Sequence, residues 1–233
     1  MNSAESFNHI YQRACERKGG VAALAALLSL PAAAADIKAI PDNICLAELT
    51  KKVFQSGFVW RVVKQKWPGF CEVFFDFDIE KMLLMSDEML ENKAQDTRII
   101  RNAKKVFTIR ENAQMIADIQ HKHGSFAGFI AEWPTDDIIG LWAYLKQYGA
   151  RLGGNTGPYA LRAIGKDTFI LSTDVEAYLR ATNVFDGGIS SKRSLAQIQQ
   201  QFNLWQQQSG RSLTEISQII ALSTGDNYVG MQQ

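Results

Sequence analysis

The chain has 233 residues, of which 46% are hydrophobic and 21% charged. This balance excludes a disordered protein, because the chain can bury one substantial core or two lobes. The net charge of +1 neither requires nor excludes nucleic acid as a partner, since a local basic surface decides that question. Three cysteines without CxxC spacing argue against a disulfide framework and favour a reducing compartment, so a cytoplasmic protein is expected.

An apolar stretch near the N-terminus, Val21–Ala35, resembles the core of a secretion signal. The residues before it include Glu5 and Glu16, whereas the region that precedes a secretion signal is short and basic. The stretch is also shorter than the roughly 20 residues that a membrane-spanning helix needs. A helix that Pro31 ends is the simpler interpretation, so neither export nor a membrane partner is expected.

Apolar residues recur at helical spacing along the chain, and no long alternating pattern indicates a sheet. The expected fold class is therefore all-α. The expected helices are, in chain order, roughly Glu5–Arg17, Val21–Ser29, Asp42–Gln55, Val59–Lys66, Pro68–Phe74, Asp78–Met85, Asp87–Gln95, Arg101–His123, Ser125–Ala131, Asp137–Gln147, Gly157–Ala163, Val175–Arg180, Ser194–Gln208 and Leu213–Ser223. N-terminal capping side chains are expected at Asp42, Asp78, Ser86, Ser194 and Ser212, the last with Glu215 in a capping box.

Local composition qualifies this prediction at three places. Cys71–Phe77 fits a strand or a short buried helix equally well. Asp186–Ser191 is rich in glycine and serine and is the best linker. The glutamines of the following helix, from Gln197 to Gln208, are interpreted mostly as a solvated face.

Basic residues gather in two segments that contain no acid. These residues are Lys51, Lys52, Arg61, Lys64 and Lys66 in the first segment, and Arg98, Arg101, Lys104, Lys105 and Arg110 in the second. Such segments can supply the phosphate contacts that dominate affinity for DNA. On charge alone, a solvated helix face is the simpler interpretation.

A glycine-rich turn, Leu152–Ala160 (LGGNTGPYA), joins two expected helices. Glycine permits positive φ and close approach of the backbone. Free N–H groups at the start of the second helix form an anion site that a DNA phosphate fits. An ordinary corner between two helices of a bundle explains the turn equally well.

The turn resembles the hairpin of the endonuclease III-like DNA glycosylases, with Leu152, Gly154, Thr156 and Ala160 in corresponding places. A second resemblance narrows the family. Gln55–Val63 (QSGFVWRVV), Lys64–Phe77 (KQKWPGFCEVFFDF), Asp96–Lys105 (DTRIIRNAKK) and Phe126–Trp133 are similar, in order and spacing, to segments of the DNA-3-methyladenine glycosylase I family. The chain is identified as a divergent member of that family.

This resemblance implies a helix-hairpin-helix DNA glycosylase fold with two helical lobes and a cleft between them. By this resemblance, residues 1–233 are expected to form a single glycosylase-like unit, with the helix-hairpin-helix within about 138–180. The N-terminal segment 1–40 and the C-terminal segment 186–233 are then expected to pack as, or with, the second lobe.

The resemblance also implies a pocket that holds a base extruded from duplex DNA between aromatic rings. Trp60 matches the family's pocket tryptophan, and Tyr11 and Tyr159 are further candidates. A methylated purine is cationic and is attracted to electron-rich rings. The residues expected to contact DNA are Gly154, Asn155, Thr156, Gly157, Lys192 and Arg193.

The catalytic acid is where the chain departs from the family. The family's base-recognising glutamate falls on Lys52, and Glu48, one turn earlier, is a substitute. The superfamily's catalytic aspartate falls on Ser172. Asp174, two residues later, either stabilises positive charge on the sugar or simply caps the next helix.

Two absences bear on chemistry. The family's structural zinc uses Cys and His near both termini, but the section from Asp186 contains neither residue, so no metal or other cofactor is expected. Pro158 occupies the place of the lysine that lyase relatives use, so strand cleavage is not expected.

The prediction is a monomeric DNA glycosylase that removes alkylated purines such as 3-methyladenine from double-stranded DNA in base excision repair. One alternative is a non-catalytic DNA-binding protein on the same scaffold, which Lys52 and Ser172 favour. Another is a helical interaction protein with no role on DNA.

Overall fold

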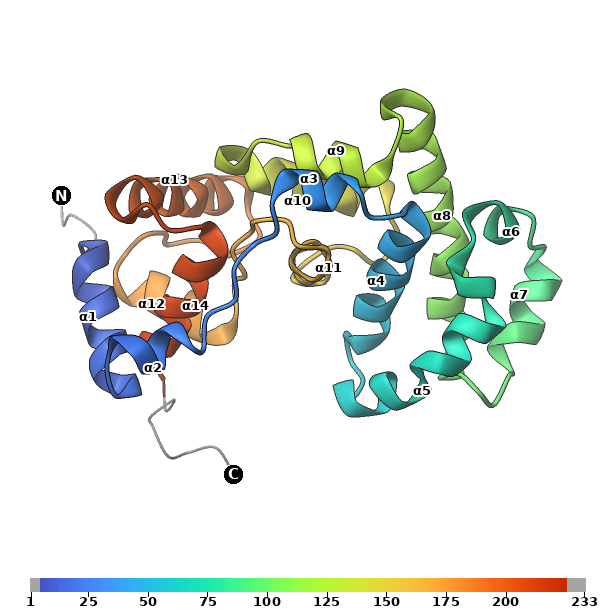
Figure 1. Cartoon of the computed structure of the whole chain (residues 1–233), viewed down its shortest axis with the longest axis horizontal. Coiled ribbons are helices and arrows are strands. Elements are labelled where there is room, and N and C mark those ends of the chain that lie inside the picture. The colour runs from blue at the N-terminus through green and yellow to red at the C-terminus, as the bar shows by residue number, and fades with distance from the viewer. Residues whose placement is uncertain (1–4, 226–233) are drawn as a thin grey trace. The chain divides into compact units, whose positions relative to one another are not determined.

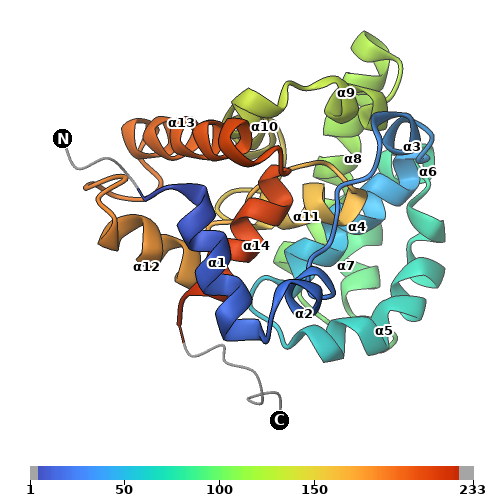
Figure 2. The ribbon, with the colours of Figure 1, turned by 60° about the vertical axis from the view of Figure 1, so that its left-hand side comes forward.

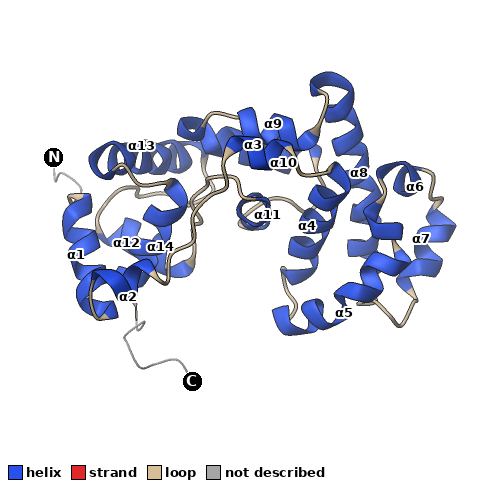
Figure 3. Cartoon of the chain, in the orientation of Figure 1, coloured by secondary structure: helices blue, strands red, loops and turns tan. Residues whose placement is uncertain are grey.

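The computed structural model describes residues 5–225. Within this range the regular elements are all helices and no strand is present (Figure 3). The all-α prediction is therefore confirmed. Contacts divide the chain into a central unit, Ala32–Trp133 with Gly140–Lys166, and a terminal unit, which holds the described residues of Met1–Pro31, Pro134–Ile139 and Asp167–Gln233.

The central unit is built around α4 and α8 (Figure 1). Its helices are α3 (Ala34–Lys38), α4 (Asp42–Gln55), α5 (Trp60–Val73), α6 (Ile79–Leu83), α7 (Asp87–Ala94), α8 (Ala103–His123), α9 (Phe126–Glu132), α11 (Thr156–Ile164), the short 3-10 turn η1 (Phe75–Phe77) and all but the first two residues of α10 (Ile138–Tyr148). Leu46, Leu49 and Val53 line the buried face of α4. Their spacing of three and four residues is that of a single helix face, which explains why α4 presents one apolar stripe to its neighbours.

The terminal unit contains α1 (Phe7–Lys18), α2 (Val21–Ala25), η2 (Thr135–Asp137), α12 (Thr173–Ala181), α13 (Lys192–Ser209) and α14 (Leu213–Ser223). Helices α1 and α14 lie side by side, as Figure 2 shows. Their contact makes these two helices, distant in sequence, parts of one core. The rings of Phe169 and Phe202 stack at 4.1 Å in this core, and Trp205 is fully buried.

Helix boundaries agree closely with the sequence except in two places. Helix α5 is continuous, with Pro68 inside it, whereas the sequence predicts a break there. Proline removes one N–H donor from a helix, but stacking of Trp67 on both Phe70 and Phe77 at 5.4 Å ties the two halves of α5 to one cluster. The second difference is that α2 ends at Ala25, before Pro31, and α3 follows in the alanine-rich segment.

Three of the five predicted caps are confirmed, namely Asp78, Ser86 and the Ser212–Glu215 capping box. The prediction for Ser194 is wrong because Ser191 caps α13. The prediction for Asp42 is also wrong, since Pro41 occupies that position of α4. The Asp42 carboxylate instead accepts the backbone N–H groups of Phe126 and Ala127 at 2.8 and 3.0 Å, and so satisfies the first turn of α9.

The ambiguous segment Cys71–Phe77 is not a strand. It contains the end of α5 and the turn η1, in which Phe75, Asp76 and Phe77 all have positive φ. Few residues other than glycine adopt this backbone. Phe77 is fully buried against Trp67, and this packing holds the strained turn in place.

The first described turn of the terminal unit carries a charged cluster that makes stability depend on pH. Arg13 donates two hydrogen bonds to Glu5, at 2.8 and 3.0 Å, and the Tyr178 hydroxyl donates a third at 2.8 Å. The bond from Arg13, opposed by partial burial, lowers the pKa of Glu5. Because the pKa of Glu5 is lower in the folded than in the unfolded chain, its carboxylate stabilises the fold at pH values above the unfolded-state pKa. This stabilisation is lost as the pH falls from there through the folded-state pKa.

We therefore expect Glu5→Gln to flatten the loss of stability on acidification. The free energy of unfolding, measured in urea between about pH 7 and pH 3, will fall more steeply for the wild type than for this variant. Glu16→Gln, at an exposed position of α1, is the control and is expected to retain the wild-type slope. Equal slopes for wild type and Glu5→Gln would show that Glu5 is not the source of this pH dependence.

Candidate functional site

A cavity of about 360 Å³ lies in the central unit, between the C-terminal end of α4, the start of α5 and the turn before α11. The described residues that line it are Lys52, Gln55, Ser56, Trp60, Gly153, Gly154, Asn155, Thr156 and Tyr159. Two of the three predicted pocket aromatics are thus brought together. The Trp60 and Tyr159 rings meet edge to face at 5.7 Å, an arrangement that aromatic quadrupoles favour. Trp60 is 51% exposed, so its ring is open to a ligand.

Lys52 brings a positive charge into this cavity. Its ammonium lies 5.1 Å from the centre of the Trp60 ring and donates a hydrogen bond to Gln55 Oε1 at 2.9 Å. Burial lowers the pKa of Lys52, partly opposed by the carboxylate of Glu48. No Asp or Glu is among the described residues that line the cavity. The cavity is therefore aromatic and cationic.

The turn beside the cavity is held by its own hydrogen bonds. The N–H of Gly157 donates to Leu152 O at 3.1 Å, and that of Thr156 donates to Gly153 O at 3.3 Å. A Cβ on Gly157 would lie 2.6 Å from Leu152 O, so glycine is required there for close approach. Gly157 is buried with its N–H group used inside the turn. Its predicted role as a phosphate ligand is therefore corrected to a structural one.

Fewer residues of the turn are accessible than the four that the sequence predicts to contact DNA. Gly154, at φ +60°, and Asn155 are exposed, and Thr156 is half-buried. All three line the cavity. A ligand in the cavity would therefore meet the tip of the turn.

The segment that carries Trp60 is anchored by Lys105, a residue that charge alone assigned to a basic surface. Its side chain is buried in α8, and the ammonium donates to the carbonyl oxygens of Val53, Phe54 and Ser56. These carbonyls close the C-terminal end of α4, where helices attract cations. The ammonium also lies 4.7 Å from the ring centre of Phe58. Burial, and then repulsion from Arg151, lowers the pKa of Lys105.

Helical spacing contains the signal that identifies Lys105. It lies four residues before Ile109 and seven before Asn112, both of which are fully buried on α8. A residue at these offsets shares their helix face. Periodicity could therefore have identified Lys105 as an interior residue, whereas its place in a run of cations suggested the surface.

Glu48 does not line the cavity, although it is on the same helix as Lys52. Its carboxylate pairs with Lys51 at 2.6 Å. The Lys51 ammonium in turn lies 4.6 Å from the centre of the Trp67 ring. The structure thus places the predicted substitute acid in an ion pair.

The other predicted residues belong to the terminal unit. Ser172 caps α12 by accepting the N–H of Val175 at 3.4 Å, so the alternative that Asp174 is the cap is wrong. Asp174 is half-buried in the first turn of α12. The Tyr11 ring lies 4.6 Å from the Arg211 guanidinium. Lys192 and Arg193 are exposed in the first turn of α13.

Much of the predicted basic surface is used inside the central unit. Arg98 pairs with Asp96 and Glu72, Arg110 pairs with Asp87, and Lys66 donates to Thr97 O. These contacts fix loops and helix ends. Arg61, Lys64, Arg101 and Lys104 are exposed. Of the two basic segments, these four residues thus keep their charges on the surface of the central unit.

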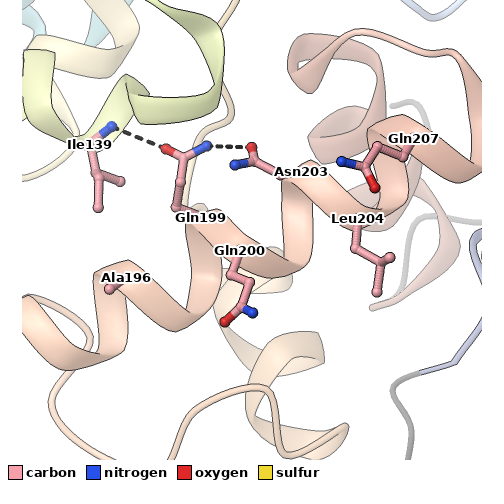
Figure 4. Close-up of a pocket in the computed structure, with 7 residues that line it drawn as sticks. All are labelled: Ile139, Ala196, Gln199, Gln200, Asn203, Leu204 and Gln207. Carbon is pink, nitrogen blue, oxygen red and sulfur yellow. Dashed lines mark hydrogen bonds between the residues drawn. The ribbon is translucent and has the colours of Figure 1, made fainter.

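A second cavity, of about 460 Å³, lies in the terminal unit along α13 (Figure 4). Gln199 is buried there, accepts the N–H of Ile139 at 3.1 Å and donates to Asn203 at 2.8 Å. Interpreting Gln199 as part of a solvated face is therefore wrong. Its amide joins α13 to the segment Pro134–Ile139, and Asn203 extends this link by donating to Asp136 O at 2.9 Å. These polar groups are used in packing.

Among residues 5–225, no helix is long and apolar enough to span a bilayer.

This structure is an all-helical protein with an aromatic cavity at a glycine-rich turn between two helices. Residues 39–153, which include Lys52, Trp60 and Lys105, match the model of the methyladenine glycosylase family. That segment is similar to the methyladenine glycosylase family, and the resemblance found in the sequence is confirmed. No curated protein matches the chain significantly.

Solved structures show likeness over different shares of the chain. 3-Methyladenine DNA glycosylase I from Staphylococcus aureus is 25% identical, with 53% of this chain and 76% of that chain covered and a TM-score of 0.48. A tyrosine-to-phenylalanine variant of 3-methyladenine DNA glycosylase I in complex with 3-methyladenine is 24% identical. The match covers 58% of this chain and 83% of that chain, with a TM-score of 0.49. The Methanocaldococcus jannaschii 8-oxoguanine glycosylase/lyase with DNA is 15% identical. The match covers 92% of this chain and 88% of that chain, with a TM-score of 0.47. The likeness to the methyladenine glycosylase family rests on the match of residues 39–153.

We expect Lys105→Met to destabilise the protein by about 2–4 kcal/mol, because three carbonyls lose a charged donor and the end of α4 is left unsatisfied. The loss of stability is measured as the decrease in the free energy of unfolding in urea. Lys104→Met is the matched control, since Lys104 is exposed in the same helix, and should change stability by less than about 0.5 kcal/mol. An equally small effect at Lys105 would show that its hydrogen bonds do not hold the segment.

Proposed function

We propose that this protein is a monofunctional DNA glycosylase that removes an alkylated purine from duplex DNA. The observation that carries the proposal is the cavity formed by Trp60, Tyr159 and the glycine-rich turn, of which Trp60 lies inside the matched segment 39–153. An extruded base stacks well against an indole, and the adjoining ring supplies an edge contact. A monomer acting in the cytoplasm is part of this proposal.

The reaction replaces the bond between C1′ of the sugar and the purine nitrogen by a bond to water oxygen. The base leaves with the bonding electrons, and the attacking water loses one proton, which goes to an uncharged base or, when the base is already cationic, to solvent. An abasic site remains. A carboxylate near the sugar lowers the barrier, because positive charge develops at C1′ as the bond breaks. Asp174 and Glu48 are the proposed acids, with Asp174 preferred because it lies two residues after Ser172, where the superfamily's catalytic aspartate falls.

Duplex binding is proposed to use both the turn and exposed cations. Gly154, Asn155 and Thr156 form the tip of the turn, where backbone groups contact a phosphate without reading a base. Lys192 and Arg193 add positive charge at the start of α13. Affinity for any duplex is then expected to fall with rising salt.

Trp60→Ala is expected to lower the rate of base release from alkylated duplex DNA about tenfold to a hundredfold, because the extruded base loses its stacking surface. Trp60→Phe retains an aromatic face and should keep most of the rate. Release is measured by chromatography of the freed base, with gel shifts on the same preparation as the check on duplex binding. A wild-type rate in Trp60→Ala would remove this residue from the pocket.

Asp174→Asn is expected to lower base release by about a hundredfold, and Glu48→Gln by less, because only an ionised acid stabilises charge at the sugar. Glu176→Gln is the matched control, since Glu176 lies in the same first turn and pairs with Arg180. Normal release by the Glu48→Gln, Asp174→Asn double variant would exclude this mechanism.

A non-catalytic DNA-binding protein is the second candidate. The absence of acids among the described residues that line the cavity favours it. It predicts tight, salt-sensitive duplex binding with no release of any base, so gel shifts and release assays on one preparation distinguish the two. Absence of duplex binding at low salt would instead favour a helical interaction protein.

A further inference from the structure

The sign of the charge inside the cavity bears on which base it accepts. The Lys52 ammonium lies over the Trp60 ring, at 5.1 Å from its centre, and is held there by Gln55. The other lining residues described are uncharged at neutral pH. A ligand stacked at Trp60 therefore meets a fixed positive charge.

Neighbouring acids do not cancel this charge within the cavity. Glu48 is one helical turn before Lys52, but its carboxylate is 2.6 Å from Lys51 and is not among the described lining residues. Lys51 is itself turned to Trp67, which is part of the buried aromatic cluster. The pair of Glu48 with Lys51 therefore leaves Lys52 as the charge that faces the ligand.

A cationic base and an uncharged base respond to this arrangement in opposite ways. A purine alkylated on N3 or N7, such as 3-methyladenine or 7-methylguanine, carries a positive charge in DNA and gains from an electron-rich ring and a nearby anion. Here an ammonium already occupies the ring face, and like charges at this separation repel. An uncharged purine with a carbonyl oxygen or an unprotonated ring nitrogen at its edge would instead accept a charge-assisted hydrogen bond from Lys52.

We propose that Lys52 determines the specificity of this site, and that it selects uncharged alkylated purines whose edge carries hydrogen-bond acceptors. Cationic bases such as 3-methyladenine or 7-methylguanine in DNA are disfavoured. This inference rests on the proposed function, since it assumes that an extruded base enters the cavity. It narrows the alkylated purines to one chemical class.

The test uses duplexes of one sequence that differ in a single base. O6-Methylguanine and 1,N6-ethenoadenine represent uncharged alkylated purines, and 7-methylguanine represents the cationic ones. The dissociation constant of each duplex is measured at low salt, and base release is followed on the same samples. The quantity of interest is the ratio of affinities for uncharged and cationic bases, because it cancels contacts to the DNA backbone.

The wild type is expected to bind at least one of the two uncharged bases about tenfold more tightly than the cationic base. Lys52→Glu should reverse this preference, and Lys52→Met should bring the ratio close to one. Lys122→Glu makes the same change of charge at an exposed residue of α8 and should leave the ratio unchanged. If Lys52→Glu does not fold, Lys52→Met answers the question.

The outcomes separate the inference from the proposed function. A wild-type preference for the cationic base, or a ratio that both Lys52 variants leave unchanged, overturns the role of Lys52 even if bases are released. Lysine-dependent discrimination without any base release overturns the glycosylase proposal and supports Lys52 as the selecting residue. A protein that binds none of the duplexes overturns both.

Discussion

The buried ammonium of Lys105 is the interaction on which the site depends. It joins α8 to three carbonyls at the end of α4, and the chain from there leads through a short loop to Trp60, the first residue of α5. A free cation in the interior is costly, but the carbonyl ends of a helix provide partial negative charge where that cation lies. Two of the central unit's longest helices are thereby fixed relative to each other at the point where the cavity opens.

Lys52 and Lys105 show how the same residue type serves opposite purposes within one unit. Lys105 satisfies backbone carbonyls and is closed off from solvent. Lys52 has one side-chain hydrogen bond, to Gln55, and faces a cavity. Burial lowers the pKa of both. The difference lies in the partners, which make one lysine part of the framework and leave the other to meet a ligand.

Helical periodicity predicted most of the fold because most helices bury one continuous stripe, as α4 does with Leu46, Leu49 and Val53. It failed at Pro68, where stacking of Trp67 with Phe70 and Phe77 outweighs the lost backbone donor. The N-cap prediction failed at Asp42, whose carboxylate instead accepts N–H groups in the first turn of a helix more than eighty residues away in sequence. Local sequence cannot show a partner that only the folded chain brings close.

The candidate site was predictable in part. The pairing of Trp60 with Tyr159 followed from two separate motifs, because both lie where the resembling segments place the pocket. The environment of Glu48 did not follow, since its ion pair with Lys51 depends on side-chain directions. The turn before α11 was placed correctly, but the use of its N–H groups by Leu152 and Gly153 was not.

Gly69 offers a different kind of information about this architecture. A Cβ at that position would lie 2.4 Å from the carbonyl oxygen of Arg98, so α5 and the segment before α8 touch backbone to backbone. Any larger residue would force these two segments apart. Residues that line the cavity are free to diverge as the preferred ligand changes, whereas Gly69 is constrained whatever the ligand. Glycine is thus expected at this position in any chain that keeps this packing, whichever ligand its cavity accepts.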